Sequence, residues 1–258
     1  MSSGLPGPLR LFDLDGRVAV VTGASSGLGE GLARGLASVG ARVAVVARRP
    51  DRLAKLAEEI GGAAVPCDLL DPDQVQEVVP QVVDALGRPE ILVNAAGNIF
   101  THERAEDEPL DAVLATVHLN LVAPFRLCQE VFPHMVALGR GAIVNVSSIS
   151  GHVGVPGIPQ ASYAGSKLGL SGLTRELATQ WARHRIRVNT LAPGFFRSEM
   201  TDVMYDDERS LAWLRRNTPL PDDGTVEDFV GTVLWLVSDA SRYVTGQTIV
   251  VDGGWTAK

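Results

Sequence analysis

Two residues of the chain, Tyr163 and Lys167, have the chemistry and the spacing of an acid/base pair. Side chains at positions i and i+4 of a helix lie on the same face, one turn from each other. An ammonium group beside a phenol favours the phenolate and so lowers the pKa of the phenol. We therefore predict that Tyr163 is a general acid/base and that Lys167 tunes it. The alternative is a solvated tyrosine and a surface lysine, and the rest of the chain decides between the two.

A glycine-rich turn near the N-terminus is typical of nucleotide binding. It lies between a β-branched run, Arg17–Thr22, and an amphipathic segment, Gly27–Ser38. Glycines let a backbone approach a pyrophosphate, and the following helix N-terminus supplies amide donors. The spacing is G-x-x-x-G-x-G rather than G-x-G-x-x-G, and a purely structural turn is the alternative. The predicted cofactor contacts of this turn are Gly23, Ser25, Ser26, Gly27, Leu28 and Gly29.

The residues after the second predicted strand indicate which cofactor is preferred. An acidic residue there would bind the 2′-hydroxyl of a ribose, whereas an arginine accommodates a 2′-phosphate. In this chain Arg42–Ala47 is followed by Arg48 and Arg49, with no acid before Asp51. A guanidinium can bind a phosphate through two hydrogen bonds, so we predict NADP(H). The alternative is that both arginines are solvated.

Short apolar runs alternate with longer amphipathic stretches along the chain. Strands are predicted at residues 17–22, 42–47, 63–67, 90–94, 142–146, 187–191 and 248–251. Helices are predicted at residues 27–38, 51–60, 73–86, 110–138 and 160–184, the fourth bent at its prolines. This alternation predicts a parallel α/β sheet covered by helices on both faces. We expect one dinucleotide-binding domain at residues 15–258 after a flexible tail at residues 1–14.

Composition argues against several classes of protein. The 258 residues carry a formal net charge of −7, which gives no electrostatic support for nucleic-acid binding. Cys67 and Cys128 are the two cysteines, and they indicate reduced thiols in a cytoplasmic protein. The five histidines form no ligand motif, so no metal site is predicted. We expect neither a secretory signal nor a membrane span, since no stretch approaches ~20 apolar residues.

Together these motifs resemble those of the one-domain short-chain dehydrogenases/reductases. The matching segments, in family order, are Thr22-Gly23-x-x-x-Gly27-x-Gly29, Asn94-Ala95-Ala96-Gly97, Asn120, Ser148, Tyr163-x-x-x-Lys167 and Pro193-Gly194. The resemblance covers the chain from about residue 15 to its end. It implies a Rossmann-type, doubly wound sheet of seven parallel strands and a homotetramer. It also implies an oxidoreductase that transfers a hydride between NADP(H) and a ketone or secondary alcohol.

The resemblance also implies roles for individual residues. The catalytic tetrad would be Asn120, Ser148, Tyr163 and Lys167, with Asn120 holding a water that links Lys167 to solvent. Further cofactor contacts would be Arg48, Arg49, Asp68, Leu69, Asn94, Ala95, Ala96, Gly97, Tyr163, Lys167, Pro193, Gly194, Phe196 and Ser198. The substrate pocket would include Asn98, Ile99, Phe100, Ser148, Ser150, His152, Gln160, Phe195 and Met200, under a lid at residues 195–217.

Several of these residues have simpler alternatives. Asp68 could only cap the next helix, Asn120 could lie on a helix surface, and His152 could be an exposed loop residue. Two departures from the family pattern concern other positions. Asn94-Ala95-Ala96-Gly97 replaces the usual N-N-A-G, and the separation of Ser148 and Tyr163 is longer than usual. The extra residues lie within GVPGIPQAS and should reshape the rim of the substrate site.

Substrate and function class stay open at this level. The ends of the chain are most similar to gluconate 5-dehydrogenases and 3-oxoacyl-carrier-protein reductases. β-Ketoacyl thioesters, sugar acids such as ketogluconates, and cyclic or aromatic ketones are all compatible with the resemblance. The competing hypotheses are an NADP-binding sensor or scaffold and a sugar-nucleotide epimerase or dehydratase. The latter type has a larger C-terminal region, and only about sixty-five residues follow Pro193 here.

Overall fold

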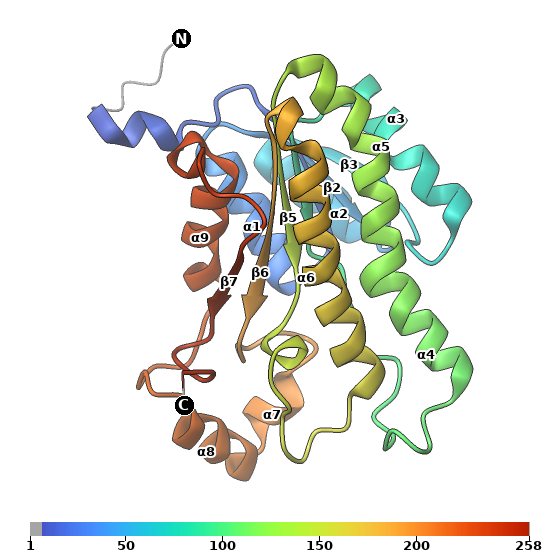
Figure 1. Ribbon diagram of the computed structural model, residues 1–258, viewed down its shortest axis with the longest axis vertical. Coiled ribbons are helices and arrows are strands. Elements are labelled where there is room, and N and C mark those ends of the chain that lie inside the picture. Colours follow the sequence, from blue (N-terminus) through green and yellow to red (C-terminus); the bar gives the residue numbers. More distant parts are fainter. Residues whose placement is uncertain (1–6, 258) are drawn as a thin grey trace.

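Seven parallel strands form one sheet in the order β3-β2-β1-β4-β5-β6-β7. The computed structural model in Figure 1 describes residues 7–257. From β1 the chain adds β2 and then β3 toward one edge of the sheet. It then returns and adds β4 to β7 on the other side of β1, so the direction in which strands are added reverses between β1 and β4. Ligands of such sheets bind at this reversal, beyond the carboxyl ends of the strands. The predicted doubly wound, Rossmann-type sheet is confirmed, and its strands are β1 (Val18–Thr22), β2 (Arg42–Ala47), β3 (Ala63–Pro66), β4 (Ile91–Asn94), β5 (Gly141–Val146), β6 (Ile186–Pro193) and β7 (Thr248–Val251).

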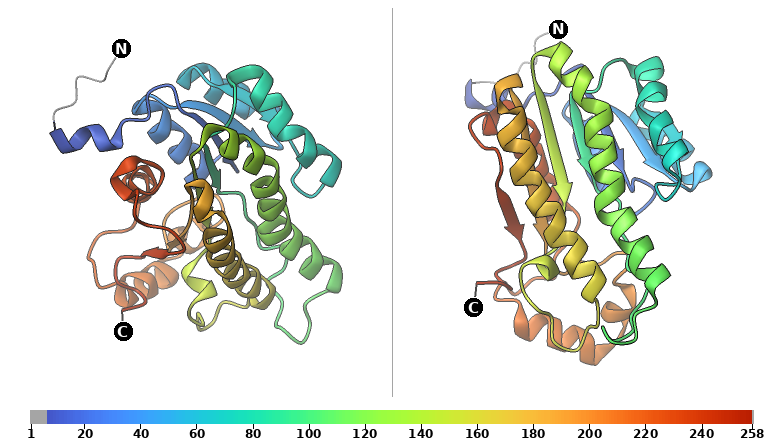
Figure 2. Two further views of the ribbon diagram at one scale, coloured as in Figure 1. Left: turned by 45° about the horizontal axis from the view of Figure 1, so that its top comes forward. Right: turned by 45° about the vertical axis from the view of Figure 1, so that its right-hand side comes forward.

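Helices cover both faces of the sheet (Figure 2). One core layer is shared by α1 (Gly27–Ser38), α2 (Pro50–Ile60) and α9 (Glu227–Val237). The opposite layer is shared by α3 (Pro72–Leu86), α5 (Ala123–Leu138) and α6 (Ala161–Trp181). Three short helices lie near the carboxyl ends of the strands, and they are α4 (Leu110–Val117), α7 (Asp202–Asp206) and α8 (Glu208–Asn217).

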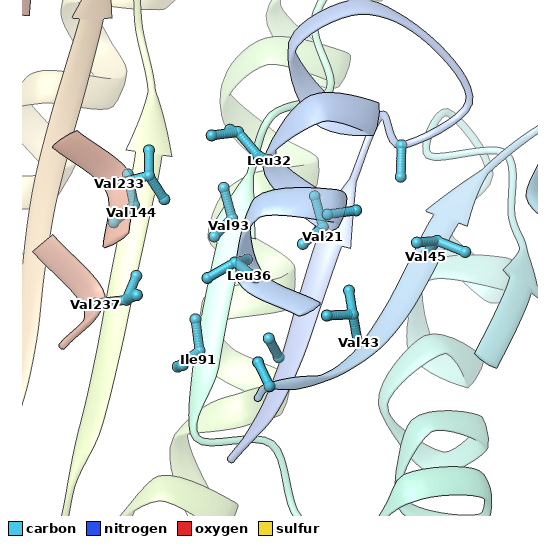
Figure 3. Packing of buried hydrophobic residues seen from close by; sticks show 14 of the residues in the cluster. Val21, Leu32, Leu36, Val43, Val45, Ile91, Val93, Val144, Val233 and Val237 are labelled. Atoms are coloured by element: carbon cyan, nitrogen blue, oxygen red, sulfur yellow. The ribbon is translucent and has the colours of Figure 1, made fainter. Parts of the chain in front are cut away.

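Helices cover both faces of the sheet, so the strands have buried side chains on each face. Successive side chains of a strand point to opposite sides. Val21 and Val93 therefore face α1 and α9, where they pack with Leu36 (Figure 3), whereas Val20 and Leu92 belong to the other layer. All five residues of β1 are buried, as expected for a continuous hydrophobic run in a parallel sheet. Each predicted strand lies within two residues of its observed bounds.

The long helix predicted at residues 110–138 is divided in the structure. Helix α4 ends at Val117, a π-helical turn covers His118–Val122, and α5 begins at Ala123. Within this turn the Ala123 N–H donates to the His118 carbonyl, an i→i−5 bond. Pro124 follows at once and has no N–H to continue an α-helical ladder. Single π-helical turns of this kind are frequent at functional sites, and this one carries Asn120.

The same segment, Leu110–Leu138, is long and apolar enough to cross a membrane by length and composition. This differs from the sequence-based expectation, which found no such stretch. A single helix of this kind is weak evidence for a membrane protein, since core helices pass the same test. In the structure α5 packs along α3 and against β4 and β5.

Two further regions differ from the predictions. Helix α9 is absent from the sequence-based assignment because residues 229–237 are apolar at most positions and show no helical period. Of the tail predicted at residues 1–14, residues 1–6 lie outside the described residues. Gly7–Phe12 form a 3₁₀ helix, and Leu14 is completely buried in the core beneath α1.

Candidate active site

A cavity of about 540 Å³ lies at the carboxyl ends of the strands. Its size is within the usual range for small-molecule sites. Loops that follow β1, β2, β3, β4, β5 and β6 all contribute to its wall, together with the first turns of α6. Nearly all residues predicted for catalysis, cofactor and substrate line this cavity, and the exceptions are Asn94, Asn120 and His152.

The backbone conformation and close contacts of the turn after β1 favour glycine at its glycine positions. Gly23 and Gly27 have φ values of 69° and 55°, in the left-handed region that favours glycine. A Cβ at Gly23 would lie 2.8 Å from the Cα of Ala96. The Thr22 hydroxyl accepts hydrogen bonds from the amides of Ala95 and Ala96, both at 3.1 Å, and so joins this turn to the loop after β4. The N-terminus of α1 then lies at the cavity, where it can hold an anion.

Tyr163 and Lys167 lie in the first turns of α6 and are both nearly buried, with 9% and 3% of their surface exposed. The Lys167 ammonium is 5.6 Å from the centroid of the Tyr163 ring. It donates a hydrogen bond of 2.8 Å to the Val146 carbonyl, at the end of β5. Helix α6 and strand β5 therefore hold the ammonium and the phenol together at the cavity wall, as the i, i+4 spacing predicts.

Burial controls the protonation of both groups. It lowers the pKa of Lys167 to about 8, and it raises the pKa of Tyr163 in spite of an opposing hydrogen bond with Ser148. The expectation that the pKa of Tyr163 is lowered is therefore wrong for this state of the protein, since removal of the phenol from water outweighs its neighbours. A protonated phenol that lines a cavity can donate a proton to a bound ligand.

Asn120 is completely buried behind the cavity wall rather than exposed on a helix surface. Its amide exchanges two hydrogen bonds of 3.0 Å with the backbone of Asn98, and it also donates to the Ser166 hydroxyl at 3.1 Å. Gly97 lies next to it, and a Cβ there would be 2.8 Å from the Lys167 ammonium nitrogen. Asn120 thus fixes the loop after β4 beside Lys167, and a side chain at Gly97 would displace the lysine ammonium.

Asn94 and His152 lie apart from the cavity. The Asn94 side chain is buried between strands and donates to Asn145 at 2.8 Å, so it ties β4 to β5. Asn145 in turn donates to Thr174 of α6 at 2.9 Å, which extends this buried polar network beneath the site. His152 is exposed, as in its simpler alternative. The structure therefore gives Asn94 a role in holding the strands and leaves His152 outside the pocket.

Of the two predicted arginines, Arg49 is the one that the structure fixes. Its guanidinium donates to the hydroxyls of Ser25 at 3.0 Å and Ser26 at 2.7 Å, next to the glycine turn. Arg48 also lines the cavity but is exposed to solvent. Asp68 lines the cavity as well, and its carboxylate accepts from the amide of Leu70 at 3.0 Å, while Asp71 caps α3.

Several lining residues were not predicted. The most informative is Glu199, which lines the cavity and pairs with Arg49 at 3.0 Å. The sequence holds no signal for this pair, because the two residues are 150 positions apart. The other unpredicted residues include His102, Ile158, Thr201 and Met204.

The predicted lid, residues 195–217, contains α7 and α8. Phe195, Trp213 and Trp255 form a cluster of ring contacts, with centroids 4.9–6.1 Å apart. These contacts attach the lid to the C-terminal end of the chain. Phe195 and Met200 face the cavity, so the aromatic residues both anchor the segment and contribute to the pocket wall.

Comparisons with known proteins agree with this geometry. The sequence model of the family described as Enoyl-(Acyl carrier protein) reductase matches residues 23–256. The chain is 39% identical to a gluconate 5-dehydrogenase of Gluconobacter oxydans, over 95% of this chain and 97% of that protein. It is 40% identical to the 3-oxoacyl-[acyl-carrier-protein] reductase FabG of Thermotoga maritima, over 93% of this chain and 98% of that protein.

A solved structure extends the comparison to the fold. It is that of a gluconate 5-dehydrogenase from Burkholderia cenocepacia in complex with NADP and tartrate. Its TM-score is 0.89 at 36% identity, and the alignment covers 96% of this chain and 98% of that one. The family match covers most of the sequence, and the sheet order and the clustered Ser148, Tyr163 and Lys167 agree with it. The chain belongs to the short-chain dehydrogenase/reductase family of oxidoreductases.

Proposed function

We propose that this protein interconverts a ketone and a secondary alcohol with NADP(H), and that Tyr163 is its general acid/base. The observation that carries the proposal is the placement of a buried phenol and a buried ammonium in the same cavity as a glycine turn. A cofactor site and a proton donor that share one cavity support hydride transfer coupled to proton transfer.

The residues present fit NADP(H). The turn with Gly23 and Gly27 leads into the N-terminus of α1 at the cavity wall, where backbone amides can bind a pyrophosphate. Arg49 lies beside Ser25 and Ser26 and offers donors to a 2′-phosphate. The NADP bound to the Burkholderia cenocepacia relative supports the same choice for this chain. When bound, NADP(H) supplies or accepts the hydride.

Three side chains of this protein would act on the substrate carbonyl. The Ser148 hydroxyl donates a hydrogen bond to the carbonyl oxygen, and the Tyr163 hydroxyl donates its proton to the same oxygen. The resulting phenolate is stabilised by the Lys167 ammonium, which is already within 5.6 Å of the ring. In the reverse direction Tyr163 accepts the proton of the alcohol. The water relay assigned to Asn120 by resemblance stays a prediction.

The cavity supports an uncharged substrate. The arginines and lysines in its lining, among the described residues, are Arg48 and Arg49 after β2 and Lys167 of α6. Neither arginine is available to a substrate carboxylate if both face the cofactor. The cavity wall also contains several large apolar side chains, which are Ile99, Phe100, Ile158, Phe195, Met200 and Met204. A cyclic or aromatic ketone therefore suits this wall better than a ketogluconate.

The homotetramer and the cytoplasmic location stay predictions. An exposed apolar strip on α4 and the following turns supports self-association, since Leu110 and Leu114 are 70% and 60% exposed. Val122, Phe125 and Leu168 extend the exposed apolar surface of these helices.

The decisive experiment compares Tyr163→Phe with wild type. Oxidation of NADPH and NADH is measured with a cyclic ketone, an aryl ketone, 5-ketogluconate and a β-ketoacyl thioester. We expect NADPH turnover with at least one ketone and a fall in kcat of about 10²–10⁴-fold in Tyr163→Phe, because the proton donor is lost. NADPH binding should persist. Tyr243→Phe is the matched control, since Tyr243 is fully exposed.

Three results would count against the proposal. Turnover that survives in Tyr163→Phe removes the acid/base role, and preference for NADH removes the argument from Arg49. NADPH binding without turnover of any ketone in the panel favours the sensor or scaffold alternative.

A further inference from the structure

A carboxylate of this protein already forms an ion pair with Arg49, the arginine beside the proposed cofactor site. Glu199 lies in the loop between β6 and α7, and its carboxylate is 3.0 Å from the Arg49 guanidinium. The same carboxylate pairs with Arg52, in the first turn of α2. Both Arg49 and Glu199 line the cavity. An anion is therefore bound at this point by the protein itself.

All three guanidinium nitrogens of Arg49 already donate hydrogen bonds in this arrangement. Its Nε donates to Ser25, one terminal nitrogen donates to Ser26, and the other donates to Glu199. A 2′-phosphate that binds Arg49 needs donors from the edge that Glu199 now uses. A carboxylate that stayed beside a phosphate would also repel it, since like charges at contact distance disfavour each other.

We propose that Glu199 competes with the 2′-phosphate of NADP(H) for Arg49 and Arg52, and so sets how strongly the protein prefers NADP(H) to NAD(H). This inference rests on the function proposed above, in which Arg49 binds that phosphate. Glu199 is charged near neutral pH. The hydrogen bond from Arg52, and to a smaller extent those from Arg49 and Ser26, lower the pKa of Glu199 to about 2. Protonation therefore does not remove this charge near neutral pH.

The competition also reaches the substrate side of the cavity. Glu199 is followed directly by Met200, and Phe195 and Phe196 lie a few residues before it in the same loop. While Glu199 pairs with Arg49 and Arg52, this loop is tied to the start of α2. A phosphate that takes over the arginines releases the loop from that contact, whereas NAD(H), which has no such phosphate, leaves the contact in place.

The test measures binding of NADP⁺, NAD⁺ and adenosine 2′,5′-bisphosphate to the full chain by titration calorimetry. We expect Glu199→Gln to tighten binding of NADP⁺ and of the bisphosphate by about three- to tenfold, as for the loss of one or two exposed ion pairs. Binding of NAD⁺ should not change. Asp202→Asn is the matched control: it removes a charge from the same segment, where Asp202 pairs with Arg197 at 3.1 Å.

Arg49→Met separates the two proposals. If it weakens NADP⁺ binding while Glu199→Gln has no effect, competition by Glu199 is wrong and the cofactor site stands. If wild type binds NADP⁺ no more tightly than NAD⁺ and Arg49→Met changes neither, both proposals fail. Equal tightening by Asp202→Asn, or of NAD⁺ by Glu199→Gln, would show a general charge effect and overturn the competition. Weaker NADP⁺ binding in Glu199→Gln would overturn it as well.

Discussion

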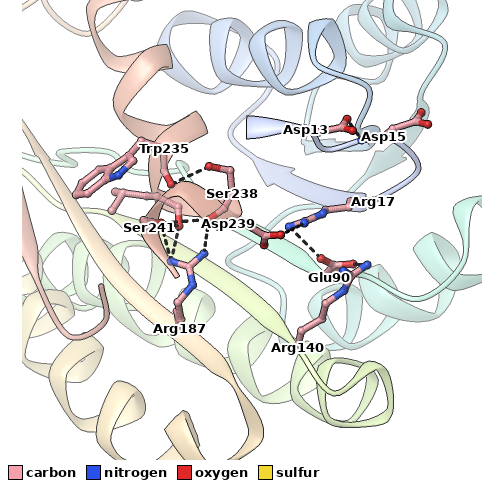
Figure 4. Close-up of polar contacts among 11 residues, drawn as sticks. Asp13, Asp15, Arg17, Glu90, Arg140, Arg187, Trp235, Ser238, Asp239 and Ser241 are labelled. Atoms are coloured by element: carbon pink, nitrogen blue, oxygen red, sulfur yellow. Dashed lines mark hydrogen bonds and ion pairs between the residues drawn. The ribbon is translucent and has the colours of Figure 1, made fainter. Parts of the chain in front are cut away.

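Charged side chains are buried at both ends of the sheet, but the two ends differ in whether a group of opposite charge lies beside them. At the amino ends of the strands, Arg17 pairs with Glu90 at 3.4 Å and with Asp239 at 3.0 Å (Figure 4). Arg140 completes the group at 2.9 Å from Glu90, whose side chain is 7% exposed. Nearby, Arg187 donates to main-chain carbonyls at the end of α9. The buried charges of Arg17 and Glu90 at this end therefore have partners of opposite charge.

At the carboxyl ends, Lys167 is buried without a counter-ion. Within residues 7–257 it forms no ion pair, and its ammonium donates to the neutral Val146 carbonyl. Burial lowers the pKa of Lys167 to about 8 with no charged group of the described chain to oppose it. Burial also raises the pKa of Glu90, but Arg17 and Arg140 oppose that shift. An uncompensated charge in a cavity costs stability and is expected where it serves chemistry. The contrast predicts that charges at one end hold the fold and that Lys167 serves the reaction.

The largest expected effect comes from Lys167→Met. Loss of the ammonium removes the group that stabilises the phenolate of Tyr163, so we expect kcat to fall by about 10²–10⁴-fold. The free energy of unfolding should hold within about 1 kcal/mol or rise, because the substitution removes an unpaired buried charge. Steady-state kinetics and urea unfolding measure the two quantities. Lys55→Met, at an exposed position of α2, is the control and should change neither. A large loss of stability in Lys167→Met would break the contrast.

At the other end we expect the reverse result from Arg17→Met. Glu90 is left with Arg140 alone, so we expect a loss of about 3 kcal/mol in the free energy of unfolding. This is the lower end of the range for removing one partner of a buried pair, because Arg140 remains at 2.9 Å. The loss should shrink at acid pH, because burial already raises the pKa of Glu90 and protonation removes the charge that Arg140 alone would oppose. The measurement is urea unfolding at several pH values, with kcat expected to stay unchanged.

Arg34→Met is the matched control for that change. Arg34 also bridges two carboxylates, Glu30 at 2.6 Å and Glu59 at 2.7 Å, but 42% of its side chain is exposed, against 12% for Arg17. Exposed pairs contribute about 0–1 kcal/mol. Equal losses in the two variants would show that burial does not decide the cost.

The strands could be predicted from the sequence because burial on both faces gives continuous β-branched runs, as in Val18–Thr22 and Arg42–Ala47. The π-helical turn at His118–Val122 could not, since its i→i−5 bond leaves no mark on the spacing of apolar residues. Helix α9 is apolar on most sides and shows no helical period. Its start does carry a signal, since Asp228 accepts from the Thr225 N–H at 2.7 Å in a Thr-x-x-Asp pattern, but without a periodic run this pattern does not by itself predict a helix.

The site divides in the same way. The pairing of Tyr163 with Lys167 follows from their spacing, whereas the direction of the Tyr163 pKa shift depends on burial, which a motif does not contain. Asn94 was assigned to the cofactor by its place after β4, but its side chain bonds the neighbouring strand. Glu199 reaches Arg49 from a distant loop, so only the folded chain shows their contact.

The smallest expected effect sharpens the contrast through pH. The pKa of Lys167 is about 8 in the folded protein, against an ordinary value of 10.5. Below pH 8 both states carry the charge, and the full cost of burial is present. Between these values the folded state loses its proton first, so the unfolded state binds more protons and stability rises with pH. Relative to Lys167→Met, the unfolding free energy of the cofactor-free protein should rise by about 3 kcal/mol across this window.

Both proteins should carry Tyr163→Phe, so that the phenol does not titrate in the same range. The measurement is urea unfolding of the two variants at matched pH values. A difference that stays flat across the window would mean that Lys167 keeps its charge with a compensating partner. Lys167 would then be a buried charge with a compensating partner, as Arg17 is at the amino ends of the strands.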